Sequence, residues 1–324
     1  MIISRSPLRV SLIGGGSDLP SHYKEFGGKV LGFAINKYVY LALHDYFAKG
    51  IKLAYSRIEV VKNFENIEHP IFRETLRYLN FREDIEIGSF ADVPSNGTGL
   101  GSSSAFTCAL VKGLAKMKNS ELESEEIAKI ACEIEINFCK SPIGKQDQWL
   151  SALGGFNSLE FKSKEEVNYS RVNIHPNLLS NFSNIFKIYY LGYGRDANEI
   201  LEHNNVNLIP KNVNLLNQLV GEVENMKRYL EENKVYDIGN LLNESWKIKK
   251  ELNGFATNDS INSIYEKAMK FGAVGGKVLG AGGGGFILFC IPEEKHEYFT
   301  SNFNYLRELS YSISKSGTEI VYFD

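Results

Sequence analysis

Residues 92–110 read DVPSNGTGLGSSSAFTCAL, in which three alternating glycines precede three serines and an apolar run. These glycines and serines are Gly97, Gly99, Gly101, Ser102, Ser103 and Ser104. The run from 104 to 115 contains few helix breakers, which predicts a buried helix. A glycine-rich loop that opens a helix directs unpaired N–H groups and the positive end of the helix dipole at one point. The stretch therefore predicts an anion site, and phosphate is the usual ligand of such a site.

An ordinary tight turn with a serine N-cap is the alternative for this stretch. One glycine and one serine suffice for such a turn, whereas residues 97–104 contain three of each. We therefore favour the phosphate interpretation. A serine hydroxyl of the loop can also bind Mg²⁺ beside a phosphate.

The other glycine-rich stretches fit known phosphate motifs less well. Each Gly-Lys pair is followed by Val or Gln, whereas a P-loop requires Ser or Thr there, so the P-loop is excluded. The pattern GxGxxG occurs once, at Gly280, Gly282 and Gly285. The apolar run that follows it is typical of a strand, whereas a dinucleotide-binding fold needs a helix at that point. A nucleotide-binding dehydrogenase is kept as the weaker alternative.

The composition is that of an ordinary globular protein. The chain has 324 residues, 43% of them apolar and 23% charged, with a net charge of −3. This charge provides no basic surface for nucleic acid or for an anionic membrane. The N-terminus lacks the layout of a signal peptide and no apolar run is long enough to span a bilayer, which predicts a soluble cytoplasmic protein. Four cysteines lack metal-binding spacing and are expected to be reduced thiols: Cys108, Cys132, Cys139 and Cys290.

Helical and strand patterns alternate along the chain without a regular βαβ rhythm, which predicts an α+β fold. Strands are expected at 8–13, 29–46 (one strand or a hairpin), 51–56, 85–90, 185–194, 277–280, 286–291 and 318–323. Helices are expected at 70–79, 104–115, 120–140 with Ser120 or Ser124 as the cap, 212–232, 236–252, 260–272 and 293–302. Residues 164–184 are polar and irregular, so we place a boundary there between domains 1–175 and 176–324.

Two carboxylates follow the glycine–serine loop. Glu135 lies beside the apolar stripe of the helix expected at 120–140 and can reach inward. Asp147 follows a Pro–Gly turn and lies among amides and an aromatic residue. This surrounding suits a catalytic carboxylate, which Lys145 could keep ionised, although a helix-capping aspartate is the common alternative.

Arg9 and Asp18 flank the first glycine run, Gly14, Gly15 and Gly16. An arginine there could neutralise phosphate charge, and an aspartate could accept hydrogen bonds from sugar hydroxyls. Exposed surface charges are the alternative for both residues.

Three stretches together resemble the motifs of the GHMP kinases, a family that includes galactokinase, homoserine kinase, mevalonate kinase and phosphomevalonate kinase. The stretches are SPLRVSLIGGGSD, PSNGTGLGSSSA and KVLGAGGGGF, in the order that the family has. The resemblance covers essentially the whole chain. It implies two lobes, the first similar to ribosomal protein S5 domain 2 and the second ferredoxin-like, with the active site in the cleft between them.

The resemblance also implies roles for individual residues. ATP would bind at Pro94, Gly97, Gly99, Leu100, Gly101, Ser102, Ser103 and Ser104. Mg²⁺ would bind Ser103 and Glu135, Asp147 would be the catalytic base, and Arg9 would lie near the transferring phosphoryl group. The glycines at 280–285 would pack against the phosphate site. The substrate would contact Gly14, Gly15, Gly16, Ser17, Asp18, Gly144, Lys145, Arg195, Gly282 and Gly283.

The resemblance is greatest to the D-glycero-D-manno-heptose 7-phosphate kinases, on RSPLRVSLIGGGSDLPSHYKEFGGKV, GKQDQW and YLGYGRDANEIL. Galactokinases carry Glu-His where this chain has Gly15 and Gly16, which argues against galactose. The implied reaction phosphorylates the anomeric O1 of the heptose 7-phosphate to the 1,7-bisphosphate, in the biosynthesis of nucleotide-activated heptose for surface polysaccharide. The 7-phosphate would need a cationic pocket, for which Lys37, Lys145, Arg195 and Lys277 are candidates.

Fucokinase-like and other sugar kinases of the family are the alternatives within this class. A non-catalytic sugar-binding regulator is the alternative outside it, although pure binding has no use for a metal ligand and a base such as Glu135 and Asp147. The expected partner is a small sugar or sugar phosphate, with no nucleic acid and no membrane. A homodimer is left open, because no feature of the sequence decides the oligomeric state.

Overall fold

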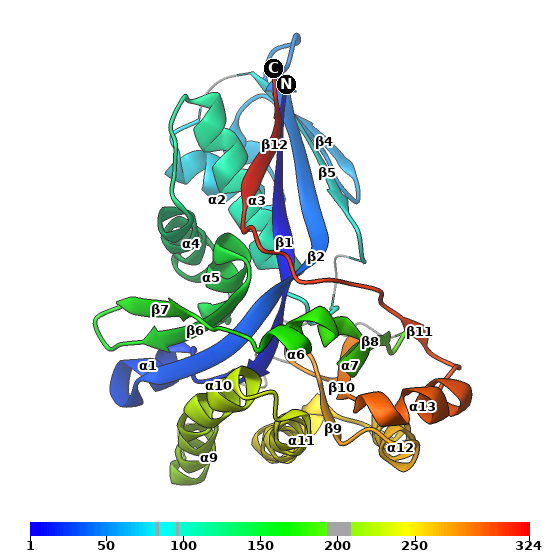
Figure 1. The fold of residues 1–324 in the computed structure, drawn as a ribbon. Helices are drawn as coiled ribbons and strands as arrows, with labels where there is room; N and C mark the ends of the chain where they lie inside the picture. Colours follow the sequence, from blue (N-terminus) through cyan, green and yellow to red (C-terminus); the bar gives the residue numbers. More distant parts are fainter. Residues whose placement is uncertain (82–83, 95–96, 193–208) are drawn as a thin grey trace.

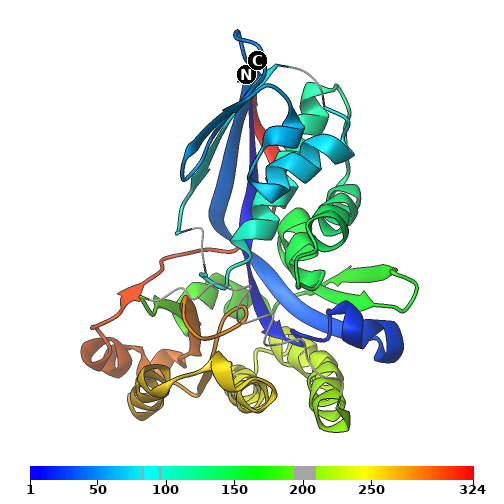
Figure 2. The ribbon, with the colours of Figure 1, turned by 180° about the vertical axis from the view of Figure 1, so that it is seen from behind.

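The computed structural model describes residues 1–81, 84–94, 97–192 and 209–324. Two sheets lie one above the other in Figure 1, and the long strands β1 (Ile2–Ile13) and β2 (Gly28–Asp45) extend from the end that carries both termini toward the second sheet. Helices cover one side of the upper sheet, and the rear view in Figure 2 shows the same arrangement. The predicted α+β class is confirmed.

The larger sheet is built around β1 and β2, which pair along most of their length. Its strands run in the order β12 (Glu319–Phe323), β1, β2, β5 (Ile85–Ala91), β3 (Ile51–Ala54) and β4 (Ile58–Val61). The first part of β2 pairs instead with β6 (Phe156–Phe161), which pairs with β7 (Val167–Arg171). The stretch expected as a strand or a hairpin at 29–46 is therefore one long strand with two successive partners on its second edge.

The smaller sheet belongs to the second half of the chain. Its order is β11 (Arg307–Glu308), β8 (Phe186–Tyr190), β10 (Phe286–Cys290) and β9 (Gly275–Val278). The helices of this half are α6 (Pro176–Ser180), α7 (Phe182–Ile185), α9 (Pro210–Gly221), α10 (Val223–Glu231), α11 (Val235–Leu252), η3 (Gly254–Ala256), α12 (Asp259–Lys270), η4 (Glu293–Lys295) and α13 (His296–Asn302). One apolar core joins β1 and β2 to β8, β10, α10 and α11, so the two halves share buried surface.

Helix α3 (Ser102–Met117) is the buried helix expected after the glycine–serine loop. It packs against β1 and β2 and against three neighbouring α-helices, which explains why it is apolar on nearly every side. The other helices of this half are α1 (Pro20–Phe26), η1 (Phe64–Asn66), α2 (Pro70–Tyr78), α4 (Ser124–Cys132), η2 (Glu133–Phe138) and α5 (Gln146–Leu153).

The helix expected at 120–140 differs from the prediction at both ends. Its N-cap is Glu123, whose side chain forms a reciprocal capping box with Glu126, so neither Ser120 nor Ser124 is the cap. Beyond Cys132 the chain continues as the π-helical turn η2 rather than as an α-helix. The single helix expected at 212–232 is two helices, α9 and α10.

The expected irregular stretch at 164–184 contains β7, α6 and α7. The domain division at 175/176 therefore stays a prediction. The last strand, β12, does not remain with the second half: it pairs with β1, with Ile2 opposite Phe323. Both termini therefore lie at the same end of the larger sheet (Figure 1).

Two further observations concern the helices and the cysteines of the described part of the chain. None of its helices is both long and apolar enough to cross a membrane. The four cysteines are free thiols, as expected, and Cys108, Cys132 and Cys290 are buried.

Two glycine turns from opposite halves of the chain touch through their backbones. Gly99, with φ of +75°, leaves no space for a side chain, because a Cβ there would lie 2.3 Å from the carbonyl oxygen of Leu279. A Cβ on Gly280 would lie 2.4 Å from the Cα of Gly99. Phe286 N donates to Thr98 O at 3.1 Å beside this contact. Glycine at both positions is therefore required for the loop before α3 to meet the turn after β9.

We expect Gly99→Ala to lower the free energy of unfolding by about 2 kcal/mol or more, because left-handed backbone and overpacking each carry a cost. Gly192→Ala is the matched control: its φ is +80°, but no atom of the residues that the structure describes lies within 4 Å of the added Cβ. Urea unfolding of both variants measures the difference. Equal losses in the two variants would contradict the importance of the contact.

Candidate active site

The loop before α3 presents backbone N–H groups at the helix N-terminus. Gly101 is the N-cap residue in a left-handed conformation, and no side chain caps the helix. Ala105 N donates to Gly101 O at 2.9 Å, so the N–H groups of Ser102, Ser103 and Ser104 precede the regular helical bonds. The serine-capped tight turn is therefore wrong, and the geometry is that of an anion site.

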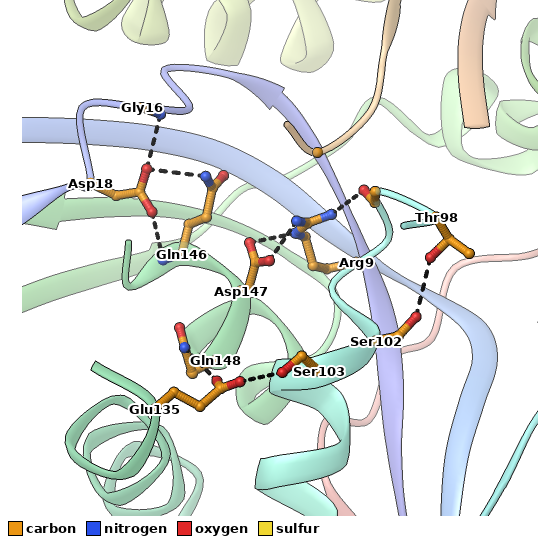
Figure 3. A network of polar contacts seen from close by, with 12 residues as sticks. Arg9, Gly16, Asp18, Thr98, Ser102, Ser103, Glu135, Gln146, Asp147 and Gln148 are labelled. Atoms are coloured by element: carbon orange, nitrogen blue, oxygen red, sulfur yellow. Dashed lines mark hydrogen bonds and ion pairs between the residues drawn. The ribbon is translucent and has the colours of Figure 1, made fainter. Parts of the chain in front are cut away.

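Glu135 is fully buried in η2, and its two carboxylate oxygens face α3 and α5 (Figure 3). Ser103 Oγ donates to Oε1 and Gln148 Nε2 donates to Oε2, each at 2.6 Å. Burial raises the pKa of Glu135, although these hydrogen bonds oppose the shift. A serine hydroxyl and a carboxylate are oxygen ligands of the kind that Mg²⁺ prefers, and both lie at the helix N-terminus, so Ser103 and Glu135 fit this ion.

Arg9 joins the glycine loop to Asp147 (Figure 3). Arg9 Nε donates to Asp147 Oδ1 at 2.7 Å and Nη2 donates to Oδ2 at 2.6 Å, while Nη1 donates to Gly99 O. Arg9 is 4% exposed, whereas the Asp147 side chain is 24% exposed. Such a bidentate pair fixes both the position and the orientation of a carboxylate. Asp147 lies in the first turn of α5, whose N-cap is Lys145, so the helix-capping interpretation of Asp147 is wrong.

Asp18 closes the turn that follows β1. Its carboxylate accepts hydrogen bonds from Gly16 N, Gln146 N and Gln146 Nε2 at 3.0–3.1 Å. Asp18 is 2% exposed, and burial raises its pKa. A Cβ on Gly144 would lie 1.9 Å from Asp18 Oδ2, so the two turns fit together only with glycine at 144. Asp18 is therefore a buried group of the site, and its interpretation as an exposed surface charge is wrong.

A pocket opens between these groups and the second half of the chain. It is lined by Arg9, Ser11, Gly15, Gly16, Asp18, Leu19, Ile143, Gly144, Gln146, Asp147, Leu216, Lys249, Leu252, Asn253, Lys277, Gly280 and Ala281. Three of its polar atoms have no hydrogen-bond partner among the described residues: Ser11 Oγ, Gln146 Oε1 and Asn253 Nδ2. Buried polar groups are normally paired, and these three unpaired atoms belong to residues that line the pocket.

Two lysines from the second half of the chain reach this pocket. Lys277 Nζ donates to Leu12 O at 3.0 Å, and Lys249 Nζ donates to Val278 O at 3.0 Å and to Gly280 O. Burial, reinforced by the Arg9 charge, lowers the pKa of Lys277 to about 7. Burial also lowers the pKa of Lys249 well below its usual range, with further contributions from Lys277 and Arg9.

Comparison with known proteins assigns the family. Residues 59–155 match the family described as GHMP kinases N terminal domain, and residues 226–299 match GHMP kinases C terminal. The chain is 30% identical to the D-glycero-alpha-D-manno-heptose 7-phosphate kinase of Campylobacter jejuni, over 91% of this chain and 90% of that protein. The chain belongs to the GHMP kinases. It is therefore a kinase that uses ATP, as its family does.

Further relatives agree with the GHMP kinase fold. The crystal structure of a D-glycero-D-manno-heptose 1-phosphate kinase from Bacteroides thetaiotaomicron superposes with a TM-score of 0.80 at 21% identity, covering 100% of both chains. Lactococcus lactis galactokinase, solved with galactose, gives a TM-score of 0.72 at 16% identity, covering 98% of this chain and 94% of that one. The Arabidopsis thaliana bifunctional fucokinase/GDP-fucose pyrophosphorylase is 27% identical over 89% of this chain, which spans 29% of that longer protein.

The GHMP kinase site brings together most of the residues expected from the sequence. Arg9, Glu135, Asp147 and the serines at 102–104 lie in one region with the turn at 14–18 (Figure 3). The roles assigned to them stay predictions. Pro94 is exposed, and Leu100, whose carbonyl accepts from Arg9 N at 3.0 Å, is buried.

Other expected residues lie elsewhere. Lys145 does not hold Asp147: its Nζ pairs with Glu165 and lies over the Tyr23 ring, outside the pocket. Lys37 does not line the pocket. Gly282 and Gly283 do not line it either, because Gly283 N donates to Ala256 O and this turn packs on η3. Ser17 Oγ donates to Gly14 O and supports the turn. Arg195 lies outside the described residues.

Sequence reasoning gave no role to Ser11, Gln148, Lys249 and Asn253. Ser11 could have been found, since in a strand it shares a face with Arg9 two residues earlier. Lys249 carries no such signal, because it lies in a polar helix that contains several other lysines.

The depressed pKa of Lys277 predicts a pH-dependent contribution to stability. Between about pH 7 and pH 10 the unfolded chain holds the Lys277 proton more firmly than the folded protein does, so this group makes stability rise with pH. Lys277→Met removes the rise, which amounts to at most about 1.4 kcal/mol per pH unit. Urea unfolding at several pH values, with Lys247→Met as the exposed control, measures it. Parallel curves for the wild type and Lys277→Met would contradict the shift.

Proposed function

We propose that this GHMP kinase transfers the γ-phosphoryl group of ATP to the anomeric O1 of D-glycero-D-manno-heptose 7-phosphate, forming the 1,7-bisphosphate. The observation that carries the proposal is the position of Asp147. Its carboxylate lines a polar pocket and is oriented by Arg9, which also binds the loop at the N-terminus of α3. The similarity to the C. jejuni heptose 7-phosphate kinase supports the choice of sugar.

The nucleotide phosphates would bind at the α3 N-terminus. The N–H groups of residues 102–104 and the helix dipole stabilise negative charge at that point. Ser103 and Glu135 would hold Mg²⁺, which supplies charge neutralisation between the phosphates when it is bound. Gln148 would position the Glu135 carboxylate, since it donates to the oxygen that Ser103 does not contact.

The acceptor would bind in the pocket, with its O1 next to Asp147. Asp147 accepts the O1 proton while an O1 lone pair forms the new bond to the γ-phosphorus, and the bond from that phosphorus to the bridging oxygen breaks to release ADP. Phosphoryl transfer depends mainly on alignment and charge neutralisation. The bidentate contact with Arg9 provides the alignment of the carboxylate.

Sugar recognition would come from the unpartnered atoms of the pocket. Ser11 Oγ, Gln146 Oε1 and Asn253 Nδ2 can each bond to a hydroxyl. Asp18 also lines this pocket. Its oxygens accept hydrogen bonds from Gly16 N, Gln146 N and Gln146 Nε2, so it would both hold the shape of the pocket and offer an acceptor to the sugar.

We expect Asp147→Asn to lower kcat by roughly 10²–10⁴-fold, the usual effect of losing a general base. ATP affinity should stay close to that of the wild type, because Asp147 does not belong to the α3 loop. Steady-state kinetics and ATP titration measure the two quantities. Asp237→Asn is the matched control, since Asp237 is an exposed aspartate in the first helical turn of α11. Wild-type kcat in Asp147→Asn would show that the base is assigned incorrectly.

The acceptor is tested by measuring ADP release with ATP, Mg²⁺ and a panel of sugars. We expect the highest kcat/KM with D-glycero-D-manno-heptose 7-phosphate, above unphosphorylated heptose, fucose, mannose and galactose. Phosphorus NMR of the product then identifies the phosphorylated oxygen. A higher kcat/KM with fucose would favour the fucokinase-like alternative, and release of ADP with none of these sugars would overturn the proposal.

A further inference from the structure

Lys249 and Lys277 line the acceptor pocket, and neither has a carboxylate partner within the part of the chain that the structure describes. They come from α11 and β9, and Lys277 is 6% exposed. The hydrogen bonds that their ammonium groups donate to described residues go to the backbone carbonyls of Leu12, Val278 and Gly280. Among the described residues, no carboxylate oxygen lies within 4.0 Å of either ammonium group.

The other charged groups that line the pocket do not compensate these lysines. Arg9 and Asp147 neutralise each other in a bidentate pair. The Asp18 carboxylate accepts three N–H groups of its own turn and of Gln146. Among the described residues, no acidic group therefore compensates a positive charge on Lys249 or Lys277, which both lie on the wall contributed by the second half of the chain.

A buried charge without a partner is costly to maintain. A phosphate group in the pocket would offset this cost, because the lysine ammonium group is a compact point charge with several hydrogen-bond donors. Each lysine has at least one donor that its backbone contacts do not use, since an ammonium group has three.

Polar atoms without partners accompany the two lysines. Lys277 reaches the carbonyl of Leu12, next to Ser11, whose buried hydroxyl has no partner. Asn253, at the C-terminal end of the helix that carries Lys249, lines the same pocket, and its buried Nδ2 has no partner among the described residues. The wall therefore fits a ligand that is both anionic and hydroxylated.

We propose that Lys249 and Lys277 form a phosphate subsite inside the acceptor pocket. The phosphate is either the group that the acceptor sugar already carries or the γ-phosphoryl group of ATP. The identity of the sugar rests on the function proposed above, whereas phosphate binding by the two lysines does not.

Titration calorimetry with inorganic phosphate tests the subsite directly, with excess ADP present to occupy the α3 loop. We expect affinity to fall roughly 10–100-fold in Lys249→Met and in Lys277→Met. Lys277→Arg should retain most of the affinity, because it keeps the charge. Lys250→Met is the control, since Lys250 lies on the same helix over the Trp246 ring and outside the pocket. Wild-type affinity in both methionine variants would overturn the proposal.

Proton uptake gives a second readout that a purely structural lysine would not change. The pKa of Lys277 in the empty pocket is about 7, and an anion beside it should raise this value again. At about pH 8, phosphate binding by the wild type should therefore take up protons, measured as a dependence of the heat on the ionisation enthalpy of the buffer. The uptake should be lost in Lys277→Met. Uptake that is equal in this variant would count against the subsite.

Kinetics with phosphorylated and unphosphorylated heptose distinguish the two sources of phosphate. If the subsite holds the acceptor's phosphate, Lys277→Met raises KM for heptose 7-phosphate and lowers its kcat/KM by a larger factor than that for the unphosphorylated sugar. If it holds the γ-phosphoryl group, kcat falls with both sugars. Should wild-type protein use neither sugar, the proposed function fails, while the calorimetric result still decides the subsite.

Discussion

The contact between the glycine turns at 99 and 280 is the constraint on which the site depends. Two backbone segments meet at a distance that leaves no room for a Cβ atom on either side. Each turn also holds a cation through a carbonyl oxygen: Arg9 donates to Gly99 O and Lys249 donates to Gly280 O. The contact therefore fixes the phosphate loop, the residue that orients Asp147 and the lysines of the second half in one arrangement.

The site separates its charges into two kinds. Arg9 with Asp147, and Asp18 with the N–H groups around it, are satisfied within the protein and define the shape of the pocket. Glu135, fully buried and bonded to Ser103 and Gln148, is likewise held in place before any ligand enters. Lys249 and Lys277 have no acidic partner among the described residues, and this difference is the basis of the proposed phosphate subsite.

A shared apolar core and the pairing of β12 with β1 also connect the two halves of the chain. Strands β1 and β2 of the larger sheet extend toward the smaller sheet, and one apolar core includes residues from both sheets. The last strand, β12, pairs with the first strand, β1. In the sequence, the second half of the chain is therefore preceded and followed by strands of the larger sheet. This arrangement limits how far the pocket walls can separate, since shared buried surface would have to be exposed.

The sequence by itself determined the features that depend on neighbouring residues. The glycine–serine loop, the buried helix after it and the long strands β1 and β2 follow from local backbone preference and from the period of apolar residues, and they were predicted. The strands β4, β6, β7 and β11 were not predicted. The cap of α4 was not predicted correctly. Glu123 caps the helix through a reciprocal contact with Glu126, whereas the nearby serines Ser120 and Ser124 were the expected caps.

The tertiary structure alone decided which charged side chains form ion pairs. Lys145, two residues from Asp147, pairs with Glu165, whereas Arg9, 138 residues away, binds Asp147. Lys249 lines the pocket, although no sequence motif predicts this position. The physical reason is that an ion pair depends on the direction and burial of side chains from distant segments, which packing fixes and sequence spacing does not encode.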